Sequence, residues 1–371
     1  MTIAAAGHVC IDLIPHWTQG SISSLQPGKM VHAEGMQVTT GGAMSNTGGA
    51  LARLGMNPIV IGKVGSDVIG DLTMSVLETV HPPERMLIQR VTEMASSYAL
   101  VISPPDADRM FIHYPGPNGT FQWSDVPYER LEDVVIFHFG YPPLMHSIYS
   151  DGGHNLETMF RKLQDRGIVT SLDTAYPDPK SEAAAADWTV WLQRVLPVTD
   201  IFLPSFDELM VMLKEPVPET LAIADLQRWA KRLHQWGAGL VGIKLGEHGL
   251  FLSGDLEILA NHEYANLRPW AGFCALMPCY SVENRGATGA GDTAIAGLLT
   301  AIHEGMAPAA GAALAAAVAA FCVEVVSATE GIPSLEVVLQ RMQGDWPLRA
   351  TGVIMADWHQ QQPEGIWVPS M

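Results

Sequence analysis

The segment NLETMFRKLQDRGIVTSLDT, residues 155–174, places a helical pattern directly before a strand pattern, and this order decides the fold class. Four apolar residues of its first part fall on one helical face: Leu156, Met159, Phe160 and Leu163. Gly167 then ends the predicted helix. The run 168–174 is apolar without clean polar alternation, which is typical of a strand covered on both faces. The segment therefore predicts one unit of an α/β fold.

The same alternation extends through most of the chain. Val- and Ile-rich runs lie at 59–65, 134–140, 200–205 and 240–246. A second amphipathic helix is predicted over 226–237. Strands that alternate with helices at intervals of about thirty residues indicate βαβ units and a parallel sheet.

Two segments, 28–40 and 96–116, interrupt this alternation. Both have the composition of exposed antiparallel strands, and neither has a helix of its own. We expect them to form a small β-sheet, or lid, that projects from the main domain. The α/β core would then consist of residues 1–27, 41–95 and 117–371.

Composition narrows the class of partner. The 371 residues include 21 Lys and Arg against 39 Asp and Glu, which gives a net charge of −18. Such an acidic chain is not expected to bind nucleic acid or an anionic membrane as its main partner. Its 4 cysteines and 13 histidines show no zinc-finger or H-E-x-x-H spacing, so they predict no metal site. We interpret the cysteines as free thiols in a reducing compartment.

Neither the N-terminus nor the most apolar run indicates a targeting or membrane segment. Residues 1–15 lack the basic stretch that begins a signal peptide. Residues 307–326 are rich in alanine and include Glu324, so a packed helix explains them better than a membrane span. We therefore expect a cytoplasmic protein. The end of the chain, 358–371, is expected to be irregular.

The stretch NRGATGAGDTAIAGLL, residues 284–299, combines a glycine-rich run with one acid at the mouth of a predicted helix. The backbone N–H groups of Gly289, Ala290 and Gly291 would form an anion site there, strengthened by the helix dipole. Asp292 beside them could accept a proton from a hydroxyl group. A base next to an anion site suits phosphoryl transfer to an alcohol. The alternative is that Asp292 only caps the helix.

The glycine-rich run differs from two common nucleotide-binding motifs. Residues 286–291 read G-A-T-G-A-G, which is not the G-x-G-x-x-G of dinucleotide-binding folds. The lysine of a P-loop is also missing. A nicotinamide-dependent oxidoreductase is therefore disfavoured.

Several segments, in the right order, resemble the PfkB (ribokinase-like) carbohydrate kinases. ATGAGDTAIAGLL (287–299) resembles the C-terminal signature of that family, and GGAMSNTGGALARLG (41–55) resembles its N-terminal signature. Further similar segments are GHVCIDLIP (7–15), IGKVGSDVIGD (61–71), GPNG (116–119), LPSFDEL (203–209), KLGEHG (244–249) and SATEGIPS (327–334).

The resemblance implies a ribokinase-like three-layer α/β sandwich, with a central mostly parallel sheet and a small β-sheet lid over the substrate. It implies ATP with Mg²⁺ as the phosphoryl donor, a sugar-like substrate, and a homodimer formed through the lid. The catalytic base would be Asp292, with the anion hole at Gly289, Ala290 and Gly291. The substrate would bind at Asp12, Gly41, Gly42, Asn46 and Asn118. The nucleotide side would contain Lys244, Gly246, Ser205 and Glu208, with Glu208 holding Mg²⁺ through water.

The chain also departs from the family pattern. Gly286 stands where the family usually has an aspartate linked to monovalent-cation activation, so that activation is doubtful here. Ser205 replaces the asparagine of an N-x-x-E motif, and we expect weaker Mg²⁺ binding rather than loss. Ala43 and the segment around Tyr141 lack the lysine and glutamate of ribokinases proper, so ribose is a poor candidate substrate.

Alternatives remain open at this stage. A nucleoside kinase of the same fold, or a non-catalytic regulator that binds a sugar or nucleotide, would share most of these features. Among single residues, Lys244 could reach a phosphate or be a solvated strand-end lysine. Asp173 could belong to a site at the sheet edge or cap a turn, and Arg109 could meet an anionic substrate or lie in a surface turn.

Overall fold

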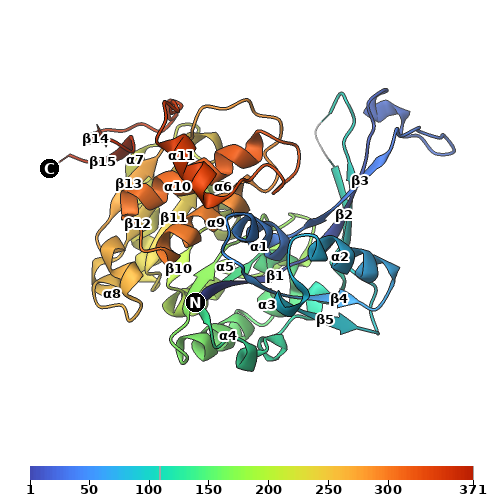
Figure 1. Cartoon of the computed structure of the whole chain (residues 1–371), viewed down its shortest axis with the longest axis horizontal. Helices are drawn as coiled ribbons and strands as arrows, with labels where there is room; N and C mark the ends of the chain where they lie inside the picture. The colour runs from blue at the N-terminus through green and yellow to red at the C-terminus, as the bar shows by residue number, and fades with distance from the viewer. Residues whose placement is uncertain (108–109, 371) are drawn as a thin grey trace.

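The computed structural model describes residues 1–107 and 110–370, so Arg109 lies outside the described residues. Its centre is an 11-stranded sheet in the order β14-β15-β13-β12-β11-β10-β9-β8-β1-β4-β5 (Figure 1). The strands from β5 to β11 along this order are parallel, and the remaining pairs are antiparallel. The sheet is therefore mostly parallel, as the apolar runs predict.

The strands have these bounds: β1 (Thr2–Gly7), β4 (Ile59–Gly65), β5 (Met86–Val91), β8 (Val134–Gly140), β9 (Val169–Leu172), β10 (Ile201–Phe202), β11 (Leu240–Lys244), β12 (Leu250–Gly254), β13 (Cys274–Met277), β14 (Trp358–Gln361) and β15 (Ile366–Pro369).

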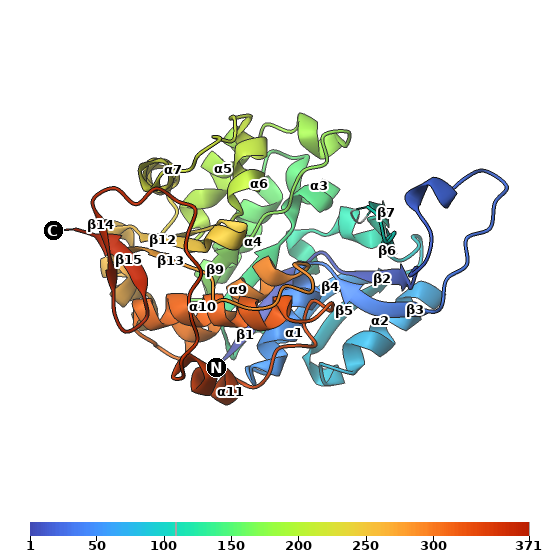
Figure 2. The same ribbon diagram turned by 90° about the horizontal axis from the view of Figure 1, so that it is seen from above.

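Helices cover both faces of this sheet and make it the middle of three layers (Figure 2). One face is covered by α3 (His146–Tyr149), α4 (His154–Gln164), α5 (Trp188–Val195), α6 (Phe206–Leu213) and α7 (Ile223–Gln235). The other is covered by α1 (Ala43–Arg53), α9 (Ala290–His303), α10 (Pro308–Val323) and α11 (Leu335–Met342). The predicted helices at 155–167 and 226–237 correspond to α4 and α7. Because apolar side chains pack on both faces, the strands lack polar alternation.

The alanine-rich run predicted to be a packed helix forms α10. Its side chains pack among the apolar residues of α9 and the central sheet, and Leu314 and Val318 are fully buried. In the parts of the chain that the structure describes, no helix combines the length and the apolar character needed to cross a bilayer. The cytoplasmic location stays a prediction.

The lid is a 4-stranded sheet in the order β3-β2-β6-β7 that projects from one end of the molecule (Figures 1 and 2). Its strands are β2 (Cys10–Pro15), β3 (Met36–Gly41), β6 (Tyr98–Ile102) and β7 (Met110–Tyr114). The predicted boundaries need correction at two points. Residues 10–15, which we placed in the core, belong to the lid because the chain continues from β1 into β2 with only two residues between them. Residues 28–35 carry no strand.

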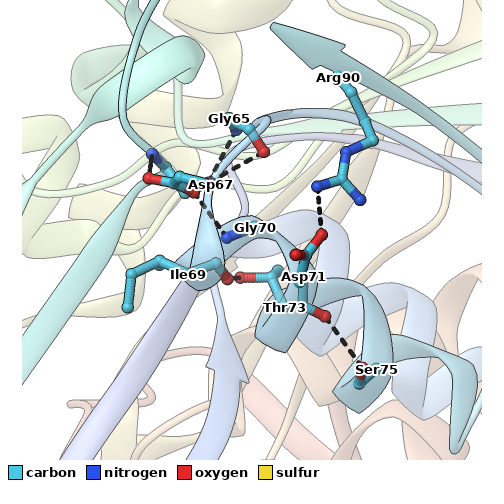
Figure 3. A network of polar contacts seen from close by, with 9 residues as sticks. Gly65, Asp67, Ile69, Gly70, Asp71, Thr73, Ser75 and Arg90 are labelled. Carbon is cyan, nitrogen blue, oxygen red and sulfur yellow. Dashed lines mark hydrogen bonds and ion pairs between the residues drawn. The ribbon is translucent and has the colours of Figure 1, made fainter. Parts of the chain in front are cut away.

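The base of the lid is fixed at Asp67, the residue that precedes α2 (Val68–Glu78) (Figure 3). The Asp67 carboxylate accepts hydrogen bonds from the backbone N–H of Gly70 at 2.8 Å and of Ser96 at 3.0 Å. It also accepts one from the Ser96 hydroxyl at 2.5 Å. Since Ser96 lies just before β6, one carboxylate both caps α2 and anchors the entry to the lid.

The C-terminal segment is not irregular, contrary to the prediction from sequence. β14 and β15 form an antiparallel hairpin, and Leu276 of β13 pairs with Trp367 of β15. Trp358 and Ile366 are buried. This polar stretch becomes ordered because these two side chains are buried and because β15 pairs with the edge of β13.

Candidate active site

Polar side chains gather at the edge of the sheet where the parallel strands have their carboxyl ends. Tyr141 follows β8, Asp173 follows β9, Ser205 follows β10, and Lys244 ends β11. In open α/β sheets this edge is where ligands bind. The position therefore agrees with the site predicted from the motifs.

The glycine-rich run forms the entry to α9 at this edge. Gly289 is the N-terminal cap of α9 with φ 81° and ψ −4°, a left-handed conformation that favours glycine. A Cβ at Gly289 would lie 2.6 Å from the Cβ of Ala328, so the backbone also approaches the 327–334 loop closely. The N–H of Ala290 donates to the carbonyl of Ala287 at 3.2 Å, so this expected anion donor is engaged in a turn.

Asp292 is buried in the first turn of α9, and its two carboxylate oxygens have different surroundings. Oδ2 accepts hydrogen bonds from Nδ2 of Asn46 at 2.9 Å and from the hydroxyl of Tyr141 at 2.7 Å. Oδ1 is buried and has no hydrogen-bond partner among the described residues. Two donors thus hold Oδ2 in place, and Oδ1 keeps its capacity to accept a proton or a hydrogen bond.

Burial raises the pKa of Asp292 above the ordinary value for an aspartate. The charge of Lys244 and the hydrogen bonds from Asn46 and Tyr141 act in the opposite direction and offset this only in part. The carboxylate is consequently more basic than a solvated one. This geometry goes beyond helix capping, because Asp292 makes no side-chain hydrogen bond to the backbone of its own helix.

Tyr141 belongs to the candidate site, although the motifs do not predict it. Nothing in its local sequence indicates contact with a residue 151 positions away. Its backbone adopts φ 67° and ψ 44° immediately after β8. A non-glycine residue with positive φ at a sheet edge was the structural signal that sequence could not supply.

Lys244 and Asp173 form a buried ion pair beside α9. The distance from Lys244 Nζ to Asp173 Oδ1 is 2.5 Å, and the two side chains are 11% and 1% exposed. Burial alone would lower the pKa of Lys244, but the neighbouring carboxylate of Asp173 raises it, so the amine stays charged. A Cβ at Gly291 would lie 3.4 Å from Nζ, which places this charge at the N-terminus of α9. Lys244 is therefore not a solvated strand-end lysine.

Glu208 lies on the first turn of α6 next to this pair. Its Oε2 accepts hydrogen bonds from the Ser205 backbone N–H at 3.0 Å and from the Thr174 hydroxyl at 2.8 Å. The serine that replaces asparagine thus positions Glu208 through its backbone. Gly246 has φ 57° in the turn after β11 and contributes backbone only.

The residues predicted to bind substrate lie where the lid meets the core. A Cβ at Gly41 would lie 2.4 Å from Oδ2 of Asp12, and a Cβ at Gly42 would lie 2.3 Å from the carbonyl oxygen of His8. Glycine is therefore required at both positions. Burial raises the pKa of Asp12 to about 6, against a smaller lowering by the Cys10 hydrogen bond. Helix α1 begins after Gly42 and places Asn46 within hydrogen-bonding distance of Asp292.

Asn118 has a structural role in this conformation. Its Oδ1 accepts from the backbone N–H of Val9 at 3.0 Å, and its Nδ2 donates to the carbonyls of Val9 at 2.8 Å and Pro115 at 2.9 Å. The side chain is fully buried. Because backbone groups occupy its amide, Asn118 ties the lid exit to the β1–β2 connection, and we do not carry it into the proposed substrate site.

Comparison with known proteins identifies the family. Residues 2–335 match the model of the pfkB family of carbohydrate kinases. An uncharacterized sugar kinase of Archaeoglobus fulgidus is 26% identical over 287 residues, which cover 76% of this chain and 98% of that protein. Because the family model spans most of the sequence, the chain belongs to the pfkB family of carbohydrate kinases.

Solved structures show the same fold. The ribokinase of Arabidopsis thaliana in complex with ribose and ATP aligns with a TM-score of 0.70 at 20% identity, covering 91% of this chain and 97% of that one. An E. coli structure in complex with ATP and Mg²⁺ aligns with a TM-score of 0.67 at 20% identity, covering 92% and 99%. The ribokinase-like fold expected from the motifs is thereby confirmed.

Proposed function

We propose that this protein transfers a phosphoryl group from ATP to a hydroxyl group of a sugar or sugar-like small molecule. The observation that carries the proposal is the buried carboxylate of Asp292, with Oδ2 fixed by Asn46 and Tyr141 and Oδ1 unpartnered within the described chain. A base needs one oriented oxygen that is free to accept a proton, and Oδ1 is left for that role.

In the proposed reaction, Oδ1 of Asp292 takes the proton of the acceptor hydroxyl. The hydroxyl oxygen bonds to the γ-phosphorus of ATP as the bond from that phosphorus to ADP breaks, and ADP leaves. The raised pKa of Asp292 suits this step, because the pKa of a more basic carboxylate lies closer to that of the alcohol that it deprotonates. Asn46 and Tyr141 hold the carboxylate in one orientation while the proton moves. They act through Asp292, so we regard them as positioning residues in this step.

The nucleotide side of the site fits ATP and Mg²⁺. ATP would supply the phosphoryl group, and Mg²⁺ would neutralise charge on the phosphate oxygens. The charged amine of Lys244 and the N-terminus of α9 offer positive potential next to Gly291. Glu208, held by Ser205 and Thr174, would orient water around the metal. The structure in complex with ATP and Mg²⁺ named above supports the same pair of cofactors.

The acceptor would bind between the lid and the core. Asp12 offers a carboxylate for sugar hydroxyls, and the absence of a side chain at Gly41 lets that carboxylate lie directly against the backbone. Lysine is replaced by Ala43, and Tyr141 contacts the base, so we do not propose ribose. A substrate that carries hydroxyl groups but no charged group next to Ala43 and Tyr141 fits better.

The test of the base is Asp292→Asn. We expect kcat to fall by about 10²–10⁴, the usual contribution of general acid–base catalysis. ATP binding should be retained, because the amide preserves the shape of the side chain. ADP release would be measured against a panel of sugars, sugar acids and nucleosides. A panel on which the wild-type protein releases no ADP above background would favour the non-catalytic regulator.

The matched control is Asp255→Asn. Asp255 caps α8 (Leu256–Ala260) with hydrogen bonds to Glu257 and Ile258 and lies outside the site. Asparagine caps helices about as well as aspartate, so this variant should keep wild-type activity. If Asp292→Asn retained more than about half of the activity, Asp292 would be a structural residue and the proposed mechanism would be wrong.

A further inference from the structure

The fold brings three candidate metal ligands together at the base of the lid, although their spacing in the sequence predicts no metal site. His8 lies between β1 and β2, Cys10 begins β2, and His113 lies on β7. One ligand atom of each residue lies within 4.8 Å of the other two. The Nε2 atoms of His8 and His113 are 3.1 Å apart.

Strand pairing explains this convergence. Asp12 pairs with Ala99, and Ala99 pairs with His113, so these residues form one row across the lid. Cys10 precedes Asp12 by two positions and therefore shares its face of the sheet. The thiol of Cys10 donates to Oδ1 of Asp12 at 3.3 Å. A thiol, an imidazole and a carboxylate thus face His8.

The chemistry of the two imidazoles suits a metal. Neutral imidazole nitrogens are the commonest metal ligands in proteins. The two Nε2 atoms lie 3.1 Å apart, within reach of one shared ion.

We propose that His8, Cys10 and His113 bind a thiophilic divalent metal ion, with Zn²⁺ fitting best, and that the bound ion fastens the lid to the core. Two nitrogens about 2.05 Å from a shared zinc and 3.1 Å apart subtend an angle of roughly 100°, close to tetrahedral. Two histidines and one cysteine supply nitrogen and thiolate ligands of the kinds that zinc takes, and the fourth position would be open to water.

Binding requires the thiolate of Cys10. In the free protein the Cys10 sulfur donates a hydrogen bond to Oδ1 of Asp12, so it carries the S–H proton. On binding, the sulfur–metal bond forms as the S–H bond breaks, and one proton leaves to solvent past Asp12, whose carboxylate already accepts from the thiol. No electron transfer is involved. The test does not depend on kinase activity, because none of the three ligands contacts Asp292. Cys10 does contact Asp12, so the ion would lie beside the proposed substrate site.

The experiment is a Zn²⁺ titration of the reduced, full-length protein against a chromophoric chelator. We expect one ion per chain, and Cys10→Ser and His113→Gln should each weaken binding by at least about tenfold. Cys279→Ser and His32→Gln change a thiol and an exposed imidazole outside the cluster and should bind as the wild type does. Replacement by Co²⁺ should give a thiolate-to-cobalt charge-transfer band that Cys10→Ser lacks.

Hydrogen exchange tests the second half of the proposal. Zn²⁺ should slow amide exchange in β6 and β7 of the wild-type protein, but not in His113→Gln, because His113 joins the lid to the ion. Binding that is equal in all variants, or the absence of a charge-transfer band, would overturn the metal site. Unchanged exchange in β7 with zinc bound would overturn the fastening of the lid.

Discussion

Tyr141 reaches Asp292 because its backbone turns sharply at the end of β8. Its φ of 67° and ψ of 44° lie in the left-handed region, which costs a residue with a side chain on the order of 1–3 kcal/mol. Strain of this kind persists where the surrounding structure enforces it, often at functional sites. Here the conformation directs a hydroxyl group to Oδ2 of Asp292 at 2.7 Å.

Tyr141→Phe removes that hydroxyl group and keeps the ring. We expect kcat to fall by about 10- to 150-fold with little change in KM for ATP, since one hydrogen bond to a charged group contributes about 1.5–3 kcal/mol. The hydrogen bond lowers the pKa of Asp292, so its loss raises that pKa. The acidic limb of the pH–kcat profile should therefore move to higher pH.

The shift in the pH profile separates positioning from packing. Tyr264→Phe removes a hydroxyl that contacts Asn266 outside the site, and both kcat and the pH profile should stay at their wild-type values. A Tyr141→Phe enzyme with reduced kcat and an unmoved acidic limb would contradict the assigned role.

Gly286 carries a second residue-scale prediction. It stands at the position where the family usually has an aspartate, and a Cβ there would lie 3.4 Å from the carbonyl oxygen of Val325. Without a carboxylate at this position, the loop offers a cation one negative ligand fewer. We expect kcat in Na⁺ buffer to stay within about twofold of kcat in K⁺ buffer at equal ionic strength, well under 1 kcal/mol in the barrier. A large loss in Na⁺ would show that backbone carbonyls suffice for the cation.

The residues of the site differ in how far sequence could predict them. Asp292 and Asn46 lie in motifs, and their hydrogen bond agrees with the site predicted from those motifs. Asp173 was left undecided because its partner, Lys244, comes from another strand. The contact between His8 and His113 joins residues 105 positions apart and depends on lid register, which no local pattern specifies.

At the scale of elements, the cap of α2 connects the core to the lid. Asp67→Ala would remove the acceptor for Gly70 and Ser96, and loss of an N-cap costs about 0.5–2 kcal/mol. The free energy of unfolding would be measured by urea titration, with β6 exchange as a local probe. Faster amide exchange in β6 is expected because Ser96, which loses its partner, lies just before that strand.

This contribution should depend on pH with a defined sign. Burial is the largest single influence on the pKa of Asp67 and raises it, but the hydrogen bonds from Ser96 and Gly70 together outweigh it and lower the pKa. The stabilisation is therefore present above the ordinary pKa of an aspartate and is lost as pH falls through the lowered value. If the stability difference between wild type and Asp67→Ala did not shrink in acid, the charge of Asp67 would not contribute.

Strands with continuous apolar sequences were predicted correctly, and strands that depend on tertiary partners were not. The runs at 59–65 and 134–140 form β4 and β8 with the predicted bounds. The hairpin of β14 and β15 was missed because its residues are largely polar and it gains order by pairing with β13. Residues 10–15 were placed in the core rather than the lid, because their local sequence does not show that they pair with β3 and β6.

At the scale of the whole molecule, the two faces of the lid have different characters. One face carries Asp12 and His113 toward the core. The opposite face carries an apolar row in which paired residues lie side by side: Val38, Leu13, Leu100 and Ile112. Ile112 is 54% exposed, and β3 and β7 leave open edges. An apolar face beside open edges favours association.

We therefore predict a homodimer that forms through the apolar face of the lid. Ile112→Ser should shift the protein to a monomer in light scattering at micromolar concentration, with KM for the acceptor nearly unchanged. Phe111 alternates with Ile112 and so lies on the face that carries Asp12. Phe111→Ser should instead raise KM for the acceptor and leave the dimer intact, because it opens the substrate side of the lid to water. A wild-type monomer under these conditions would exclude the dimer, and equal effects of the two variants on KM would mean that the faces do not divide these roles.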